Sequence, residues 1–255
     1  MTGRRRGGSP AASEPLRYRI GAHRPKMTGG SGGSGHTPTQ REEDSMYTTR
    51  LAAALSGATV RQLAYWRRDT GTGPLLTPEY GTSPRALYSY RDVVALRICV
   101  RLRKETSLQR VRRSVAHLHQ VAPDLHLASH QLKSAGPTIV WLTEDGDYID
   151  TVERPGHMGI RVVMEEVLRA FTTADGRKVP DLRTPARGLS IDDEVRGGYP
   201  VVAGTRIPYD TIASLAQDGL GAAEIIDLYP SVTRDGIRGA LDLAELVGLP
   251  EPQSA

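Results

Sequence analysis

The twelve residues from 57 to 68, Gly-Ala-Thr-Val-Arg-Gln-Leu-Ala-Tyr-Trp-Arg-Arg, constrain the fold more than any other stretch. Thr59 can accept a hydrogen bond from a free backbone N–H group, and Gln62 can bond back to the cap residue, as in a capping box. This pattern predicts the start of a helix. Leu63 and Trp66 lie three residues apart and are expected to face a core. The other side is polar, which fits either a helix in a DNA groove or an ordinary solvated surface helix.

The segments on either side of this helix decide between those two interpretations. Thr48 or Thr49 can cap a preceding helix that runs through Leu55, and Gly57 can supply the left-handed turn between the two helices. Helix, glycine turn and helix is the layout of a helix-turn-helix. After it, residues 75–78 and 85–88 are short extended segments separated by a polar loop, which predicts a wing. Arg85 at the rim of this wing is placed to reach phosphate or the minor groove.

Two further amphipathic helices complete the first ordered unit, one from Arg91 and one capped by Ser107. Together with the wing they predict a compact basic domain. The expected inward residues are Val93, Val94, Leu96, Val100, Leu102, Leu108, Val111, Val115 and Leu118, and the expected outward basic residues are Arg97, Arg101, Lys104, Arg110, Arg112 and Arg113.

Charge is distributed unevenly along the 255 residues. Residues 46–120 carry 13 basic and 4 acidic side chains, whereas residues 189–255 carry 4 basic and 11 acidic ones. A split of this kind indicates a polyanionic partner for the first half, and a basic partner or only solvent for the second.

Several classes of protein do not fit the composition. There is no apolar run of membrane-spanning length and no apolar stretch behind the arginine-rich start, so we expect a cytoplasmic protein without a membrane segment. Cys99 is the only cysteine and is expected to be a buried structural residue. No nucleophile with its base and no phosphate-binding glycine loop can be assembled, so no enzyme and no cofactor are predicted. A metal site is the less favoured interpretation of four histidines, which are expected to be solvated or at the edge of the core: His117, His119, His126 and His130.

The flanking and central regions are less informative. Residues 1–45 are rich in Gly, Ser, Pro and Arg and predict a disordered tail, although Met27 and Met46 could each begin a shorter chain. Within the central region 121–188, residues 138–143 and 148–152 favour a β-hairpin, which could pair with another chain or pack on its own. A helix is expected from Glu165, and residues 172–188 are typical of a linker.

The segment from Tyr47 to Leu118 resembles the DNA-binding domain of the MerR family. The resemblance rests on Tyr47-Thr-Thr, on residues 57–66, on Arg85-Ala-Leu-Tyr-Ser-Tyr-Arg-Asp-Val, and on Ser107-Leu-Gln-Arg-Val-Arg. It implies a winged helix-turn-helix at 46–120 that binds inverted half-sites as a homodimer. Ala64 stands where the family usually has an arginine, and no long heptad helix or cysteine pair follows, so a metal-sensing activator is not expected. The implied DNA-binding residues are Thr49, Arg50, Thr59, Arg61, Gln62, Tyr65, Arg67, Arg68, Arg85 and Tyr88.

A last ordered unit runs from Leu189 to Gly248, before a short tail at 249–255. An extended segment at 199–208 precedes three short helices that begin near Tyr209, at Gly221 and after Thr233. The final helix is expected to turn Ile237, Ala240, Leu241, Ala244 and Leu246 inward. The outward residues are acidic and would be repelled by DNA phosphate, although three helices after a strand suit a helix-turn-helix-like fold. These acidic residues are Asp218, Glu224, Asp227, Asp235, Asp242 and Glu245.

This unit resembles a small bacterial family, domain of unknown function 433, through Gly198-Tyr-Pro-Val-Val-Ala-Gly-Thr-Arg-Ile-Pro208 and Tyr229-Pro230. Members commonly look like VapB-type antitoxins, so the resemblance implies a protein partner, a PIN-like nuclease toxin. From the residues alone, Gly204 permits a tight turn, Thr205 bonds locally and Arg206 forms an ion pair with an acid such as Asp210. The candidate partner-binding residues are Gly204, Thr205, Arg206, Asp227 and Tyr229.

The sequence therefore predicts a mainly α protein with small β elements: a MerR-like winged helix, a central hairpin region and a three-helix C-terminal domain. The leading functional hypothesis is a DNA-binding antitoxin of a type II system that represses its own operon and neutralises a basic PIN-like ribonuclease. A free-standing MerR-like regulator with a dimerising or ligand-sensing C-terminal domain is the alternative. An excisionase-like architectural protein would use the same wing but would not need the acidic domain.

Overall fold

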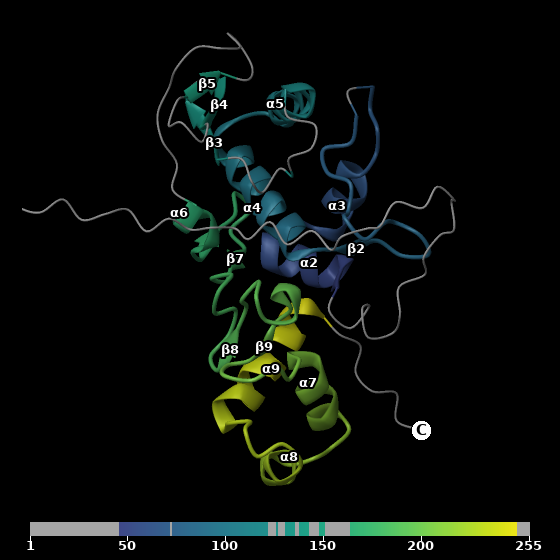
Figure 1. Cartoon of the computed structure of the whole chain (residues 1–255), viewed down its shortest axis with the longest axis vertical. Coiled ribbons are helices and arrows are strands. Elements are labelled where there is room, and N and C mark those ends of the chain that lie inside the picture. Colours follow the sequence, from purple (N-terminus) through teal and green to yellow (C-terminus); the bar gives the residue numbers. More distant parts are fainter. Residues whose placement is uncertain are drawn as a thin grey trace, which may run out of the picture. The chain divides into compact units, whose positions relative to one another are not determined.

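The computed structural model describes residues 46–121 without 72, residue 126, the segments 131–135, 138–142 and 148–150, and residues 164–248. This part of the chain is mainly helical with small antiparallel sheets, as predicted (Figure 1). The predicted tails at 1–45 and 249–255, His130 and the turn of the central hairpin lie outside the described residues. No described helix has the length and apolar character needed to cross a membrane.

The predicted helix-turn-helix forms. The Thr48 side chain caps the first helix by accepting from the Leu51 N–H group, and Gly57 ends it in the left-handed conformation with φ 82°. Ser89 and Asp92 form a second capping box at the start of the long helix that follows. The elements are β1 (Tyr47–Thr48), α2 (Thr49–Ser56), α3 (Val60–Trp66), β2 (Leu87–Tyr88), α4 (Tyr90–Glu105) and α5 (Leu108–Val121).

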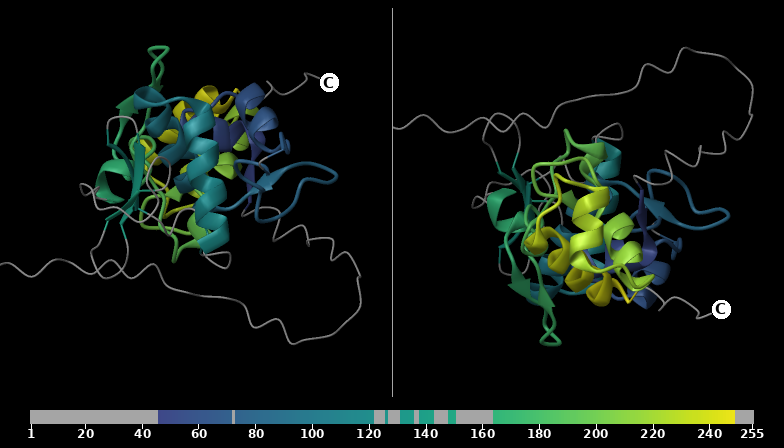
Figure 2. Two further views of the ribbon diagram at one scale, coloured as in Figure 1. Left: turned by 90° about the horizontal axis from the view of Figure 1, so that it is seen from above. Right: turned by 90° about the horizontal axis from the view of Figure 1, so that it is seen from below.

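The strand pairing at the wing differs from the prediction. β2 pairs antiparallel with β1 at the start of the domain, with Tyr47 opposite Tyr88, rather than with residues 75–78. Tyr47 and Tyr88 are both fully buried, so this pairing adds two aromatic side chains to the core. Leu75 and Leu76 are also buried and anchor the base of the wing loop, because the Leu75 N–H group donates to the Trp66 carbonyl. The loop that carries the wing projects beyond the helices (Figure 2).

The central region contains more regular structure than predicted. The expected hairpin forms from β4 (Thr138–Leu142) and β5 (Tyr148–Asp150), and β3 (Gln131–Ala135) adds a third antiparallel strand. α6 (Met164–Leu168) is the expected helix. Residues 172–188 were expected to be a linker, yet they contribute to a hairpin of β6 (Phe171–Thr172) and β7 (Lys178–Val179) and bury Val179 and Leu182.

Arg97 fastens this central segment to the helix-turn-helix. Its side chain is completely buried and makes five hydrogen bonds, all to backbone carbonyl groups. The expected outward orientation of Arg97 is therefore wrong, because residues 167–180 cover that face of α4. Burial, and secondarily the nearby charge of Arg101, lower the pKa of Arg97 to about 9, which leaves the guanidinium charged at neutral pH. The accepting carbonyls belong to Leu55, Val167, Leu168, Arg169 and Pro180.

The C-terminal unit has the three predicted helices. The Thr233 side chain caps the last one, and Gly248 ends it in the left-handed conformation. Leu241 and Leu246 were expected to face inward but are exposed, and Leu243 and Val247 are buried instead. The elements are β8 (Leu189–Ser190), a 3₁₀ turn η2 (Arg196–Gly198), β9 (Val201–Val202), α7 (Tyr209–Gln217), α8 (Ala222–Leu228) and α9 (Arg234–Val247).

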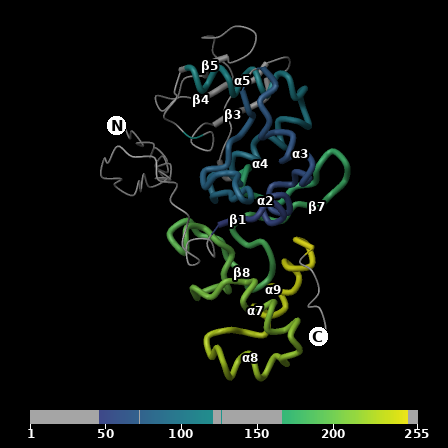
Figure 3. Tube along the Cα trace, turned by 90° about the vertical axis from the view of Figure 1, so that its right-hand side faces the viewer, coloured from purple at the N-terminus to yellow at the C-terminus, as the bar shows by residue number. Residues whose placement is uncertain are grey.

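The C-terminal unit packs directly on the helix-turn-helix at β1 and α2 (Figure 3). The Tyr47 hydroxyl donates to the carbonyl of Gly198, and its ring meets the edge of the Tyr199 ring with centroids 5.8 Å apart. The Arg50 guanidinium donates to the Gly248 carbonyl at 2.8 Å. A buried aromatic contact and two hydrogen bonds therefore join segments that are about 150 to 200 residues apart in the chain.

Replacement of Arg97 tests whether this buried arginine holds the central segment. Arg97→Met leaves five buried or partly buried carbonyl groups without their donor, and Arg97→Lys cannot reach all of them. We expect each to lower the free energy of unfolding by about 3 kcal/mol or more, measured by urea denaturation. Arg113→Met, at an exposed position of α5, is the control and is expected to change it by less than about 0.5 kcal/mol. Equal stability of the Arg97 and Arg113 variants would contradict this role.

Candidate nucleic-acid interface

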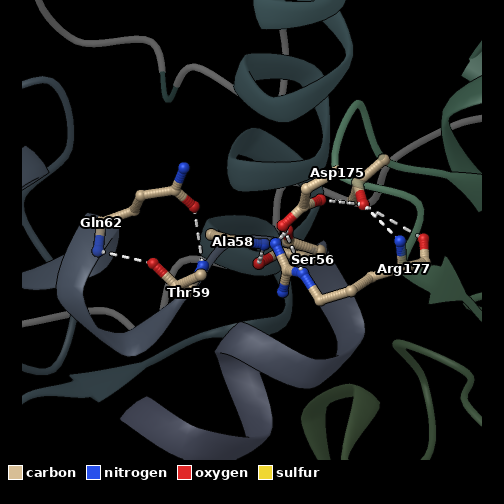
Figure 4. Close-up of polar contacts among 8 residues, drawn as sticks. Ser56, Ala58, Thr59, Gln62, Asp175 and Arg177 are labelled. Atoms are coloured by element: carbon tan, nitrogen blue, oxygen red, sulfur yellow. Dashed lines mark hydrogen bonds and ion pairs between the residues drawn. The ribbon is translucent and has the colours of Figure 1, made fainter.

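The start of α3 has the predicted capping box. The Thr59 N–H group donates to Gln62 Oε1 at 2.8 Å, and the Gln62 N–H group donates to Thr59 Oγ1 at 3.0 Å (Figure 4). Leu63 and Trp66 are almost fully buried, as expected. The backbone N–H groups of Thr59 and Gln62 thereby have hydrogen-bond partners. The buried side chains of Leu63 and Trp66 fix the rotation of α3 about its axis.

That rotation leaves one polar face of α3 in solvent. Arg61, Gln62 and Arg68 are exposed, and Tyr65 keeps 45% of its surface accessible. Arg61 and Tyr65 are four residues apart, so they lie on one side of the helix. The Arg61 guanidinium can donate paired hydrogen bonds to a guanine edge in the major groove. The Gln62 side-chain NH2 group can donate to a base edge, while its Oε1 accepts from the Thr59 N–H group.

Arg112 positions this face. It was expected on the outside of α5, and that prediction is wrong. It is buried, its guanidinium lies 5.1 Å from the centroid of the Tyr65 ring, and its Nη1 donates to the Gly73 carbonyl at 3.1 Å. Arg112 thus connects α3 to the wing loop. Helical periodicity alone gave no signal for this contact, because the aromatic partner lies 47 residues earlier in the chain.

The remaining predicted contacts divide into exposed and buried groups. Arg85 is exposed on the wing, whereas Tyr88 is fully buried and its hydroxyl accepts a hydrogen bond from Arg67. The phosphate-positioning role predicted for Tyr88 therefore needs correction: it holds the half-buried Arg67 in place. Arg50 is exposed but its guanidinium donates to Gly248, and the Thr49 hydroxyl lies 3.5 Å from the Ala86 carbonyl.

The hairpin of β6 and β7 lies beside the turn between α2 and α3, a contact that the sequence did not reveal. Its Arg177 donates to the carbonyl of Gly57 at 2.9 Å, and the Arg177 Nε lies 2.9 Å from Asp175 (Figure 4). A Cβ atom placed on Gly57 would lie only 2.6 Å from Val179 Cγ2. Gly57 is therefore required both for its positive φ and for the close approach of this hairpin, which supports the turn that leads into α3.

Two basic side chains of α4 are engaged by carbonyl groups of the central segment. Arg101 donates to the Arg169 carbonyl at 3.0 Å, and its guanidinium lies 4.3 Å from the Phe171 ring centroid. Lys104 donates to the Thr172 carbonyl at 2.7 Å. Much of the positive charge predicted to face outward on this helix instead holds the central segment.

The polar residues of the predicted partner-binding set lie around β9 and the end of α8. Gly204 has φ 75°, and Thr205 Oγ1 donates to the Val202 carbonyl, so both make the expected local turn. The predicted ion pair between Arg206 and Asp210 does not form, because Asp210 accepts from the Tyr199 hydroxyl and its own neighbour Thr211. Burial, and then Asp210, raise the pKa of Tyr199, which keeps it a neutral donor.

The acidic face predicted for the C-terminal helices is present. The acidic side chains on α8 and α9 and at the end of α7 are all exposed, and Asp227 is one of them. Within the described ranges, no three His, Cys, Asp or Glu residues gather closely enough to hold a metal ion. His126 bonds instead to the buried Asp92, with Nε2 and Oδ1 3.0 Å apart.

Residues 189–244 match DUF433, a family described as a protein of unknown function. Three uncharacterized HTH-type transcriptional regulators, two from Mycobacterium tuberculosis strains and one from Mycobacterium bovis, are each 33% identical to this chain over 118 residues. The matched residues make up 46% of this chain, and the chain spans about half the length of these curated relatives, 52%. The DUF433 match confirms the family predicted for the C-terminal unit.

One solved structure was also similar. The crystal structure of Rv2018 from Mycobacterium tuberculosis aligns with a TM-score of 0.44 and 17% identity, over 77% of this chain and 96% of that chain.

Gly57 allows a test of how the β6–β7 hairpin supports the helix-turn-helix. Gly57→Ala combines an unfavourable positive φ with a clash against Val179, whereas Gly71→Ala meets a similar φ with nothing within 4 Å. We expect Gly57→Ala to cost at least about 1 kcal/mol more than Gly71→Ala in thermal or urea unfolding. If the two variants are equally stable, the hairpin does not press against the turn.

Proposed function

We propose that the protein is a double-stranded-DNA-binding transcription regulator that holds an operator through α3. The single observation that carries this proposal is the exposed polar face of α3, with Arg61, Gln62 and Tyr65 set above the buried anchors Leu63 and Trp66. The names of the mycobacterial relatives support the same function. Neither a catalytic group nor a cofactor is part of this proposal.

A homodimer on an inverted repeat is the assembly we propose. The resemblance of residues 47–118 to the MerR family supports it, because such domains place one recognition helix of each subunit in successive major grooves. Arg61, Gln62 and Tyr65 would contact base edges and nearby phosphates, while Arg68 and Arg85 would fix the position of the protein on the phosphate backbone.

A mobility-shift titration on DNA from upstream of the chain's own reading frame tests this function. Arg61→Ala removes the exposed guanidinium at the start of α3, and we expect at least a tenfold loss of affinity, the equivalent of about 1.4 kcal/mol. Arg234→Ala, which removes an arginine that is also exposed, at the start of α9, is the matched control and is expected to bind like the wild type. Equal binding by both variants would rule out α3 as the reading element.

We further propose that the protein is an antitoxin of a type II system that represses its own operon and neutralises a basic PIN-like ribonuclease. The DUF433 match and the acidic face of α7, α8 and α9 support this role, since an acidic surface attracts a basic partner and repels DNA. The second candidate is a free-standing transcription regulator, with no toxin partner, whose C-terminal unit dimerises or senses a ligand. The cavity that Arg206 lines in the C-terminal unit favours this second candidate.

Isolation of the chain from cells that express its complete native operon distinguishes these two roles. The antitoxin proposal predicts that mass spectrometry identifies a small basic nuclease in the complex. Asp242→Asn with Glu245→Gln is expected to weaken this complex, whereas Glu105→Gln, an exposed acid at the end of α4, is expected to leave it intact. Recovery of this chain alone would contradict the antitoxin role.

A further inference from the structure

A polar cavity of ≈ 530 Å³ lies within the DUF433 unit. Its walls come from the η2 turn at Arg196, the loop after β9 at Arg206, the first half of α7 and the end of α8 at Tyr229. The volume is in the range of about 300–1,000 Å³ that small-molecule sites occupy in proteins.

The cavity concentrates positive charge in the most acidic part of the chain. Residues 189–255 contain 4 basic and 11 acidic side chains, and two of those four basic side chains, Arg196 and Arg206, line this one cavity. Thr211, Ser214 and Tyr229 add hydroxyl groups to the same walls. Guanidinium groups bind carboxylate and phosphate oxygens through paired N–H donors, and hydroxyl groups complete such sites.

The one carboxylate among the lining residues is already engaged by the protein. Asp210 Oδ2 accepts from the Tyr199 hydroxyl at 2.7 Å, and Oδ1 accepts from the Thr211 N–H group at 3.0 Å. Arg206, by contrast, is exposed and has no hydrogen bond or ion pair to another described residue. The lining therefore keeps a formal surplus of one positive charge, and one of its guanidinium groups can turn toward a ligand.

Arg196 supplies a second and independent sign of a binding site. Its φ is 50°, a left-handed value. Among the described residues, no other non-glycine residue has a positive φ. A positive φ is unfavourable for a non-glycine residue, and such backbone strain is found mainly at functional sites. In this conformation Arg196 lines the cavity wall.

We propose that this cavity binds the phosphate or carboxylate group of a small anionic molecule, with Arg206 and Arg196 as its principal ligands. This inference does not depend on DNA binding or on a toxin partner. It assigns an effector site to the DUF433 unit, on the side of Tyr199 that faces Asp210 rather than Tyr47.

The same residues connect the cavity to the helix-turn-helix. Asp210 lines the cavity and holds the Tyr199 hydroxyl, the Tyr199 ring meets the Tyr47 ring, and the Tyr47 hydroxyl donates to Gly198. Tyr47 itself belongs to β1, which directly precedes α2. A ligand that shifts Asp210, in the first turn of α7, would therefore also shift the contact between the Tyr199 and Tyr47 rings, which supports β1 and α2.

Amide-resolved NMR titration of the full chain without DNA tests the site, with inorganic phosphate and acetate as separate probes. We expect saturable shifts of the Thr211 and Ser214 amides with at least one probe, and the probe that binds more tightly shows whether phosphate or carboxylate is preferred. Arg206→Gln is expected to weaken this binding at least tenfold. Arg238→Gln, an exposed arginine of α9 outside the cavity, is the matched control and is expected to have no effect.

Two results would overturn the proposal: no saturable shift at Thr211 and Ser214 with either probe, or equal weakening by Arg206→Gln and Arg238→Gln. The connection to β1 has its own readout. Phosphate or acetate binding is expected to shift the Tyr47 amide in the wild type but not in Tyr199→Phe, which keeps the ring and loses the hydrogen bond to Asp210. An undiminished shift in Tyr199→Phe would exclude this route. Because DNA is absent, a failure of DNA binding would leave these results unchanged.

Discussion

The buried guanidinium of Arg97 supports much of the described structure, because it joins three segments that are far apart in the chain. It donates to carbonyl groups at the end of α2, around the end of α6 and at Pro180. Helix ends leave such carbonyls without partners, and a single arginine with five donors can satisfy several of them at once. The helix-turn-helix, the central segment and the hairpin beside Gly57 are thereby fixed to one another.

This use of arginine changes how the charge of residues 46–120 is understood. The surplus of nine positive charges suggests a broadly basic surface, yet Arg97, Arg101, Lys104 and Arg112 all donate to backbone carbonyls within the chain. Arg61 on α3, Arg68 just after it and Arg85 on the wing are exposed, so a partner can contact these side chains. Net charge therefore indicates the kind of partner, whereas burial identifies the residues that can reach it.

Local signals made part of this structure predictable. The capping pair Thr59 and Gln62, the turn at Gly57 and the cap at Thr233 depend on neighbours within four residues, and each appears where expected. The pairing of β1 with β2 and the contacts of Arg97 depend on residues about 40 to 80 positions away, which periodicity cannot detect. Residues 172–188 look like a linker because many of them are polar, although Val179 and Leu182 are buried. Arg206 was found by motif, but the cavity around it was not.

The exposed helix α3 lies in a domain against which the acidic C-terminal unit packs. We propose that α3 and the wing bind DNA through a small set of cationic side chains, Arg61, Arg68 and Arg85. The most direct measurement is the affinity of the full chain for a duplex from its own upstream region, followed by fluorescence anisotropy between 50 and 200 mM salt. For a dimer that neutralises about six phosphates, we expect the affinity to fall about 10³-fold over this range, because DNA binding releases counterions from the phosphates. An affinity that does not change with salt, or no binding at 50 mM, would contradict this proposal.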